Sequence, residues 1–154
     1  MPENPSGERT GMVVILTPPN SARRYQYIIR DSLFYDRNND VEMVYGVIGQ
    51  FNEEVTISNV TVSNSQIASS GAVLFSIFKL NIDGMYFDSN TQNGQIFINI
   101  FSCFFVTASN IVLDNNVLMT SSTELIKITG VGSSLTMSNI SITNTDLLSS
   151  PAVH

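Results

Sequence analysis

The sequence predicts an all-β protein, a right-handed, single-stranded parallel β-helix (a solenoid) of about five coils with essentially no helix. A ten-residue phrase recurs in the pattern Φ-x-Φ-x-(Asn/Gly)-Φ-x-Φ, where Φ is apolar, followed by two polar residues, at 55–64, 80–89, 106–115 and 135–144. Its central turn positions are Asn59, Gly84, Asn110 and Asn139, which recur at a nearly constant interval. No segment has the apolar period of a helix, whereas short segments alternate with period two.

Residues 1–24 are expected to form an irregular N-terminal cap. Residues 1–11 are polar, MVVIL at 12–16 is a candidate strand, and the two prolines of 17–24 exclude a central strand there. We expect the repeats to cover residues 25–148 and a C-terminal tail to cover 149–154.

A fainter copy of the phrase lies within residues 25–39, one repeat before the first clear copy. In the expected alignment, Val60, Val62 and Ser63 are matched in this copy by Leu33, Tyr35 and Asp36. Terminal repeats are commonly atypical, so a weak match is acceptable at this position.

Each repeat also contains a second apolar segment, at 41–49, 73–80, 96–101 and 124–130. Alternation predicts that one face carries Phe75 and Ile77, Ile98 and Ile100, and Ile126 and Ile128. Leu74, Phe97 and Phe101 would then point outward and leave an apolar strip.

Recurrence of the same turn residue favours a β-helix over an antiparallel sandwich, because equivalent residues of successive coils stack at the strand spacing of about 4.8 Å. The expected inward columns are Val60/Met85/Ile111/Ile140 and Val62/Phe87/Leu113/Ile142. The expected polar turn ladder is Asn64/Ser89/Asn115/Asn144.

Composition argues against several classes of partner. The net charge is −6, and from residue 51 onward there are seven acidic residues and only two basic ones, so we expect no nucleic-acid partner.

The apolar stretch 96–108 is too short for a membrane span and is interrupted by Asn99 and Ser102. No secretory signal is evident at the N-terminus. Cys103 is the single cysteine and is expected to be a buried hydrophobe, and we expect no cofactor.

The phrases VTISNVTVSN and LTMSNISITN, each preceded by a short strand with an Ile-x-Ile or Phe-x-Ile core, resemble repeats of the pectin-lyase-like superfamily of right-handed parallel β-helices. The resemblance covers about residues 25–148. The Asn/Ser-rich texture is most similar to long β-helical cell-surface proteins of ciliate-type protists and to adhesin-like proteins of bacteria. The resemblance implies an extracellular or cell-surface location. It leaves activity open, because the superfamily contains polysaccharide-cleaving enzymes and non-catalytic surface proteins.

One outer column could carry chemistry, and it is expected to contain Asp36, Ser63, Asp88, Asp114 and Thr143. Asp88 and Asp114 would lie about 5 Å apart at the backbone, near the carboxyl separation of a retaining glycosidase. The structural interpretation, which we favour, is that Asp, Asn and Ser are turn formers. A lyase would also need a cation beside this column, and Lys79 aligns instead with Ser102 and Gly130. A third interpretation is a calcium site formed by Asp83, Asp88 and Asp114.

Two glycosylation sequons fall within the phrase, at Asn59 and Asn139. Both would lie at coil turns, where a glycan could project. The repeat pattern also produces Asn-Φ-Ser/Thr by itself, so the sequons alone do not show modification.

The expected function is that of a non-catalytic structural or adhesin-like module of an extracellular or cell-surface protein. Its expected partners are copies of itself stacked into a filament, neighbouring coils of a larger chain, or glycans, because the end of a solenoid has unpaired strand edges. The alternative is a fragment of a polysaccharide lyase or glycoside hydrolase.

Overall fold

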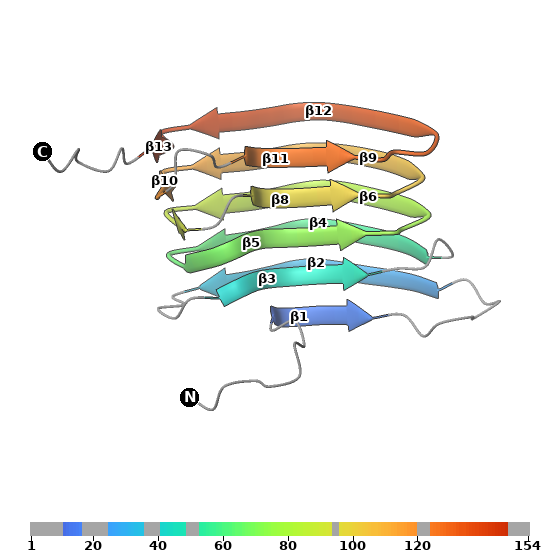
Figure 1. Ribbon diagram of the computed structural model, residues 1–154, viewed down its shortest axis with the longest axis horizontal. Helices are drawn as coiled ribbons and strands as arrows, with labels where there is room; N and C mark the ends of the chain where they lie inside the picture. The colour runs from blue at the N-terminus through green and yellow to red at the C-terminus, as the bar shows by residue number, and fades with distance from the viewer. Residues whose placement is uncertain are drawn as a thin grey trace, which may run out of the picture.

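The computed structural model describes residues 11–16, 25–35, 41–48, 53–93, 96–119 and 124–147. All regular secondary structure within these ranges is β-strand, and every strand pairing is parallel. The chain alternates between two sheets, so each strand stacks on the equivalent strand of the preceding coil (Figure 1). The prediction of an all-β parallel solenoid is confirmed for the described residues, with about four turns. Its right-handed winding stays a prediction.

The phrase strands form one five-stranded sheet, here called the phrase sheet, in the order β12-β9-β6-β4-β2. These strands are β2 (Tyr25–Tyr35), β4 (Glu53–Ser63), β6 (Lys79–Asp88), β9 (Phe105–Asp114) and β12 (Ser134–Thr143).

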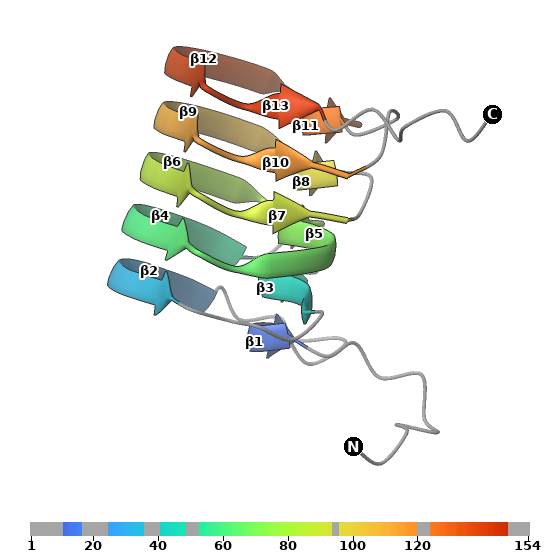
Figure 2. The ribbon, with the colours of Figure 1, turned by 90° about the vertical axis from the view of Figure 1, so that its left-hand side faces the viewer.

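The second sheet contains eight strands and faces the phrase sheet across the core (Figures 1 and 2). It comprises β1 (Gly11–Leu16), β3 (Val41–Ile48), β5 (Gln66–Phe75), β7 (Thr91–Gln92), β8 (Ile96–Phe101), β10 (Val117–Leu118), β11 (Glu124–Thr129) and β13 (Asp146–Leu147). β5 pairs with both β7 and β8, so one long strand stacks against two shorter ones.

The central turn residues of the phrase share a left-handed backbone conformation. The φ angles are 49° at Asp31, 52° at Asn59, 91° at Gly84, 55° at Asn110 and 52° at Asn139. Asp, Asn and Gly tolerate this region better than other residues. One left-handed residue resets the alternation of side chains, so that residues two before and one after it, such as Ile57 and Val60, both face the core.

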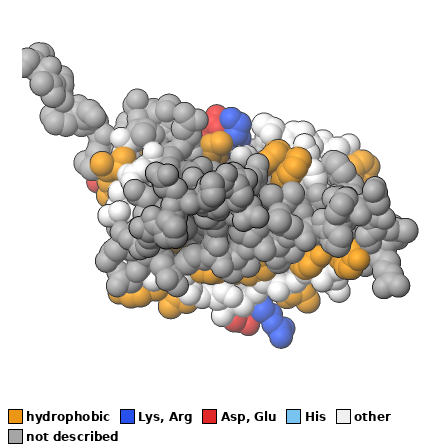
Figure 3. Space-filling view, turned by 60° about the horizontal axis from the view of Figure 1, so that its bottom comes forward, with side chains coloured by type: hydrophobic (Ala, Val, Ile, Leu, Met, Phe, Trp, Pro, Cys, Tyr) orange, Lys and Arg blue, Asp and Glu red, His pale blue; other side chains and the backbone are white. Residues whose placement is uncertain are grey.

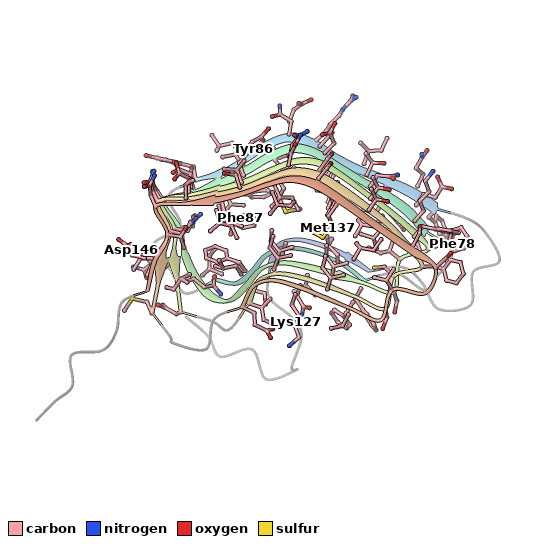
Figure 4. The ribbon with its side chains drawn as sticks, turned by 90° about the horizontal axis from the view of Figure 1, so that it is seen from above. Phe78, Tyr86, Phe87, Lys127, Met137 and Asp146 are labelled. Carbon is pink, nitrogen blue, oxygen red and sulfur yellow. The ribbon has the colours of Figure 1, made fainter. Side chains whose placement is uncertain are left out.

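The predicted inward columns of the phrase are confirmed. Val60 pairs with Met85 and Val62 pairs with Phe87, and the same columns continue into β9 and β12. Phe87 points between the two sheets while its neighbour Tyr86 points away from them (Figure 4).

The expected register of the faint first copy was wrong by one position. Ser32, and not Leu33, pairs with Val60, and Tyr35 pairs with Ser63. The reason is that Asp31 is the left-handed residue of this coil, so Asp31 is the residue that corresponds to Asn59 of the next copy. Leu33 consequently faces outward and is 66% exposed. Asp36 lies outside the described residues.

The predicted faces of the second apolar segment were partly wrong. Ile126 and Ile128 pair with Ile98 and Ile100, as expected. Leu74 pairs with Ile100 and is buried, however, whereas Phe75 pairs with Phe101 on the outer face. The cause is the left-handed backbone conformation of Ser76, whose φ angle is 55°. It interrupts the strict alternation of side chains, so the residues that face inward are not the ones that alternation predicts.

Phe97 was also expected to point outward, and it is buried. Its ring contacts the ring of Phe87 edge to face, with the centroids 5.4 Å apart. Phe101 does lie on the outer face, stacked on Phe75 at 4.3 Å. The expected apolar strip of Leu74, Phe97 and Phe101 therefore does not form.

The core runs continuously between the two sheets. Cys103 belongs to it, as expected, and burial raises the pKa of its thiol. Charged side chains are sparse and hydrophobic ones reach the surface in several places on the described part of the face in Figure 3. Among the described residues, no helix has the length and hydropathy to cross a membrane.

Candidate functional site

The acidic pair lies at one corner of the solenoid, where β6 and β9 end. Asp88 and Asp114 are direct partners in adjacent strands, so their expected proximity is confirmed. The full column reads Tyr35, Ser63, Asp88, Asp114 and Thr143.

Both carboxylates accept hydrogen bonds that join one coil to the next. The Asn115 amide donates to Asp88 Oδ1 at 3.3 Å and to Asp114 Oδ2 at 3.2 Å, and so bridges the pair. Asp114 Oδ1 also accepts from Thr143 Oγ1 at 2.7 Å and from Asn144 Nδ2 at 3.0 Å. The carboxylates therefore act as acceptors within the fold, which is the role expected of turn formers.

The hydrogen bonds at this corner do not suit Asp114 to the role of a general acid. Hydrogen bonds from Thr143 and Asn144 to the charged carboxylate lower the pKa of Asp114. A general acid of a glycosidase needs a raised pKa, so that it carries a proton at neutral pH. Asp114 is shifted in the wrong direction for that role.

Replacing Thr143 by valine should raise the pKa of Asp114 toward its ordinary value of 3.8, because the strongest hydrogen bond to the carboxylate is lost. In the wild type the folded pKa lies below the unfolded one. The carboxylate therefore stabilises the fold above pH 3.8, and this contribution is lost as the pH falls through the lower folded value. NMR titration of the Asp114 carboxyl carbon would measure the shift. Thr136→Val, on the outer face of the same strand, is the control and should leave this pKa unchanged.

Asp83, the third proposed calcium ligand, lies on the other side of the Gly84 turn and is not brought to the acidic pair. Its Oδ1 accepts from Asn110 Nδ2 at 2.6 Å and from Ser109 Oγ at 3.1 Å. Within the described residues, no group of three His, Cys, Asp or Glu side chains could hold a metal ion. The geometry therefore gives the calcium interpretation no support.

The expected alignment of Lys79 was wrong. Lys79 pairs with Phe105 on β9 and with Glu54 on β4, at the start of the phrase strands. Ser102 instead continues the turn of Ser76, since both have a φ angle of 55°. The acidic column still contains no cation along its described length.

Both sequon asparagines lie at exposed turns, as expected. Asn59 Nδ2 donates to Asp31 Oδ1 at 2.9 Å, and Asn139 Nδ2 donates to Asn110 Oδ1 at 3.0 Å. The atom that would carry a glycan thus already links two coils at each position. Glycosylation of Asn59 and Asn139 stays a prediction.

A buried asparagine ladder was missed from the sequence. Asn90 and Asn116, almost fully buried, each follow a left-handed residue and turn their amides inward. Asn90 Oδ1 accepts from the Ser65 N–H at 3.0 Å, and its Nδ2 donates to the Val62 carbonyl at 2.9 Å. Asn116 repeats this one coil later, with the Asn90 N–H at 3.0 Å and the Phe87 carbonyl at 2.9 Å.

A signal for this ladder was present in the sequence. The polar ladder was expected at the last residue of each phrase, in the column Asn64/Ser89/Asn115/Asn144. That column does form the turn, with φ angles of 48°, 56°, 50° and 46°. A further polar residue follows each phrase, and this next column, Ser65/Asn90/Asn116/Thr145, contains the buried asparagines.

The opposite corner of the solenoid carries a cluster of phenylalanines, near the labelled Phe78 in Figure 4. Phe78 stacks on Phe104 with the ring centroids 5.6 Å apart, and Phe105 meets both rings edge to face. Gly132 continues this column, where a Cβ atom would lie 2.5 Å from the Phe104 ring. The cluster is a partly exposed apolar surface that also holds adjacent coils together.

No protein-family model, curated protein or solved structure matches the chain. The fold and the corner geometry define its class as a parallel β-solenoid with hydrogen-bonded polar columns along its corners.

Proposed function

We propose that this chain is a non-catalytic structural or adhesin-like β-helix module of an extracellular or cell-surface protein. The observation that carries the proposal is the engagement of Asp88 and Asp114 in hydrogen bonds between coils. These two residues were the sharpest catalytic candidates in the sequence, and their geometry serves the fold.

Three further features support this role. The repeats and the parallel solenoid are consistent with a relationship to the pectin-lyase-like superfamily, which includes non-catalytic surface proteins. The exposed sequons Asn59 and Asn139 are suited to a glycoprotein. The phenylalanine corner and the ends of the sheets offer surfaces for partners, which we propose to be copies of the chain, neighbouring coils of a longer chain, or glycans.

We expect the protein to release no product from uronate polymers or neutral polysaccharides, because the carboxylates of Asp88 and Asp114 are engaged in hydrogen bonds between coils and no cation lies in the described part of their column. Reducing-end and unsaturated-product assays on a polysaccharide panel would check this result. Cleavage that is lost in both Asp88→Asn and Asp114→Asn, and retained in Asp83→Asn, would instead establish the lyase or hydrolase alternative. A glycan-binding array run on the same samples would distinguish an adhesin from a purely structural module.

A further inference from the structure

The exposed hydrophobic side chains concentrate at the two ends of the phrase sheet. Along its described length, β12 pairs only with β9, and β2 pairs only with β4. Nine large hydrophobic side chains are exposed among the described residues, and seven of them lie on β2 and β12. They are Ile28, Leu33 and Tyr35 on β2, and Leu135, Met137, Ile140 and Ile142 on β12. The three on β2 lie on the outer face of the sheet, whereas the four on β12 lie in its inward columns. Exposed apolar surface of the kind gathered on β12 indicates an interaction site.

The four side chains on β12 occupy columns that are core elsewhere. Leu135, Met137, Ile140 and Ile142 are 47%, 37%, 37% and 48% exposed. Their partners one coil earlier, Val106, Ala108, Ile111 and Leu113, are 1%, 1%, 0% and 0% exposed. Among the described strands, β9 is paired on both sides, with β6 and β12, whereas β12 is paired on one side only. The end therefore presents both an apolar surface and a ten-residue strand edge.

The first coil of this same chain has the geometry of a coil that would fit there. Asn139 on β12 and Asp31 on β2 are both left-handed, with φ angles of 52° and 49°. If β2 of a second copy is placed beside β12 with these two turns opposite each other, every residue of β12 has a partner in β2, and only the first residue of β2 is left over. In this register Leu135 meets Tyr27, Met137 meets Ile29, Ile140 meets Ser32 and Ile142 meets Phe34.

The second sheet matches in the same arrangement. β11 and β1 are equal in length. Their last residues, Thr129 and Leu16, belong to one column, which runs through Phe101, Phe75 and Ile48. A second copy placed with β2 on β12 therefore also brings β1 onto β11, so both edges are paired at once.

Charge does not oppose this contact. β12 contains no charged residue, and the charges of β11, Glu124 and Lys127, form an ion pair with each other at 2.8 Å. Arg30 on the incoming strand would lie over Ser138, and Asp31 would lie over the amide of Asn139. No like charges meet across the contact between these described strands.

We propose that the β11–β12 edge of one molecule binds the β1–β2 edge of a second copy, so that the solenoid continues from one chain into the next. This inference rests on the proposed function and specifies one of its partners. The contact joins two different surfaces, so it does not close on itself and would generate a series of species beyond the dimer.

Sedimentation across a wide concentration series should show association of the wild-type chain. Ile142→Glu should require at least about a tenfold higher concentration to associate, because the contact would bury an unpaired carboxylate. Ser141→Glu adds the same charge on the outer face of β12 and should associate like the wild type. Circular dichroism would verify that both variants fold. A strictly monomeric wild type, or an Ile142→Glu variant that associates normally, would overturn the inference.

Cysteine cross-linking tests the register. Ser138→Cys and Arg30→Cys, mixed under oxidising conditions, should form a disulfide between chains, since both positions are exposed and would lie on adjacent strands. Cys103 is 1% exposed, so it contributes no background. Cross-linking of Ser138→Cys with itself would show β12 paired with β12 and overturn the head-to-tail arrangement. Failure of either test leaves the non-catalytic role to be judged by the polysaccharide assays.

Discussion

Replacing Phe87 by alanine should lower the free energy of unfolding by about 3–5 kcal/mol. The side chain is 0% exposed and packs edge to face on Phe97. Its ring also fills the space above Gly71, where a Cβ atom would lie 2.5 Å from the ring. A cavity at this point would affect both sheets, because Phe87 extends from β6 toward the second sheet (Figure 4).

The matched control is Tyr86→Ala. Tyr86 precedes Phe87 in β6 but points to the outer face, so its loss should cost less than about 1 kcal/mol. Urea unfolding followed by circular dichroism would compare the two variants. Equal destabilisation would contradict the assignment of inner and outer faces.

Replacing Asn116 by alanine should be comparably damaging, at about 3–5 kcal/mol. The side chain is 0% exposed and accepts from the Asn90 N–H while it donates to the Phe87 carbonyl. It also accepts from the Asn90 amide at 3.1 Å. Alanine would leave these buried groups without their partner, far from water.

Asn115→Gly is the control for this variant. Asn115 is exposed and left-handed, and glycine keeps that backbone conformation while removing the side-chain hydrogen bonds. We expect a loss of less than about 1 kcal/mol for the exposed residue. Urea unfolding would measure the loss in free energy of unfolding for both variants. An equal loss for Asn115→Gly and Asn116→Ala would show that the buried asparagine ladder stabilises the fold no more than the exposed turn residues do.

The period of the phrase was enough to predict the parallel stacking of β4, β6, β9 and β12, because each copy places the same left-handed turn after the same number of apolar positions. The register of β2 could not be obtained this way. Ser32 stands where the other copies have an apolar residue, so the pattern around Asp31 is obscured. The phase of β5 was missed because Ser76 adopts a left-handed conformation that serine seldom takes.

The candidate site shows a similar division. The proximity of Asp88 and Asp114 follows from the period alone. Whether these carboxylates are free or hydrogen-bonded depends on the directions of the Asn115, Thr143 and Asn144 side chains. Those directions are set by side-chain rotamers, which the repeat pattern does not specify. Likewise, the run of polar residues at and just after the end of each phrase does not show that the residue after the phrase, Asn90 or Asn116, is the one that turns inward.

The buried asparagines give the solenoid a direction. Asn90 holds backbone groups of the coil before it, and Asn116 in turn holds backbone groups of the coil containing Asn90. Thr145 occupies the next position, and its hydroxyl bonds to the Thr143 carbonyl of its own coil at 3.0 Å. As the chain is synthesised from its N-terminus, each of these asparagines therefore fixes the coil made just before it, whereas the described turn that contains Thr145 makes no such side-chain bond to the backbone of the preceding coil.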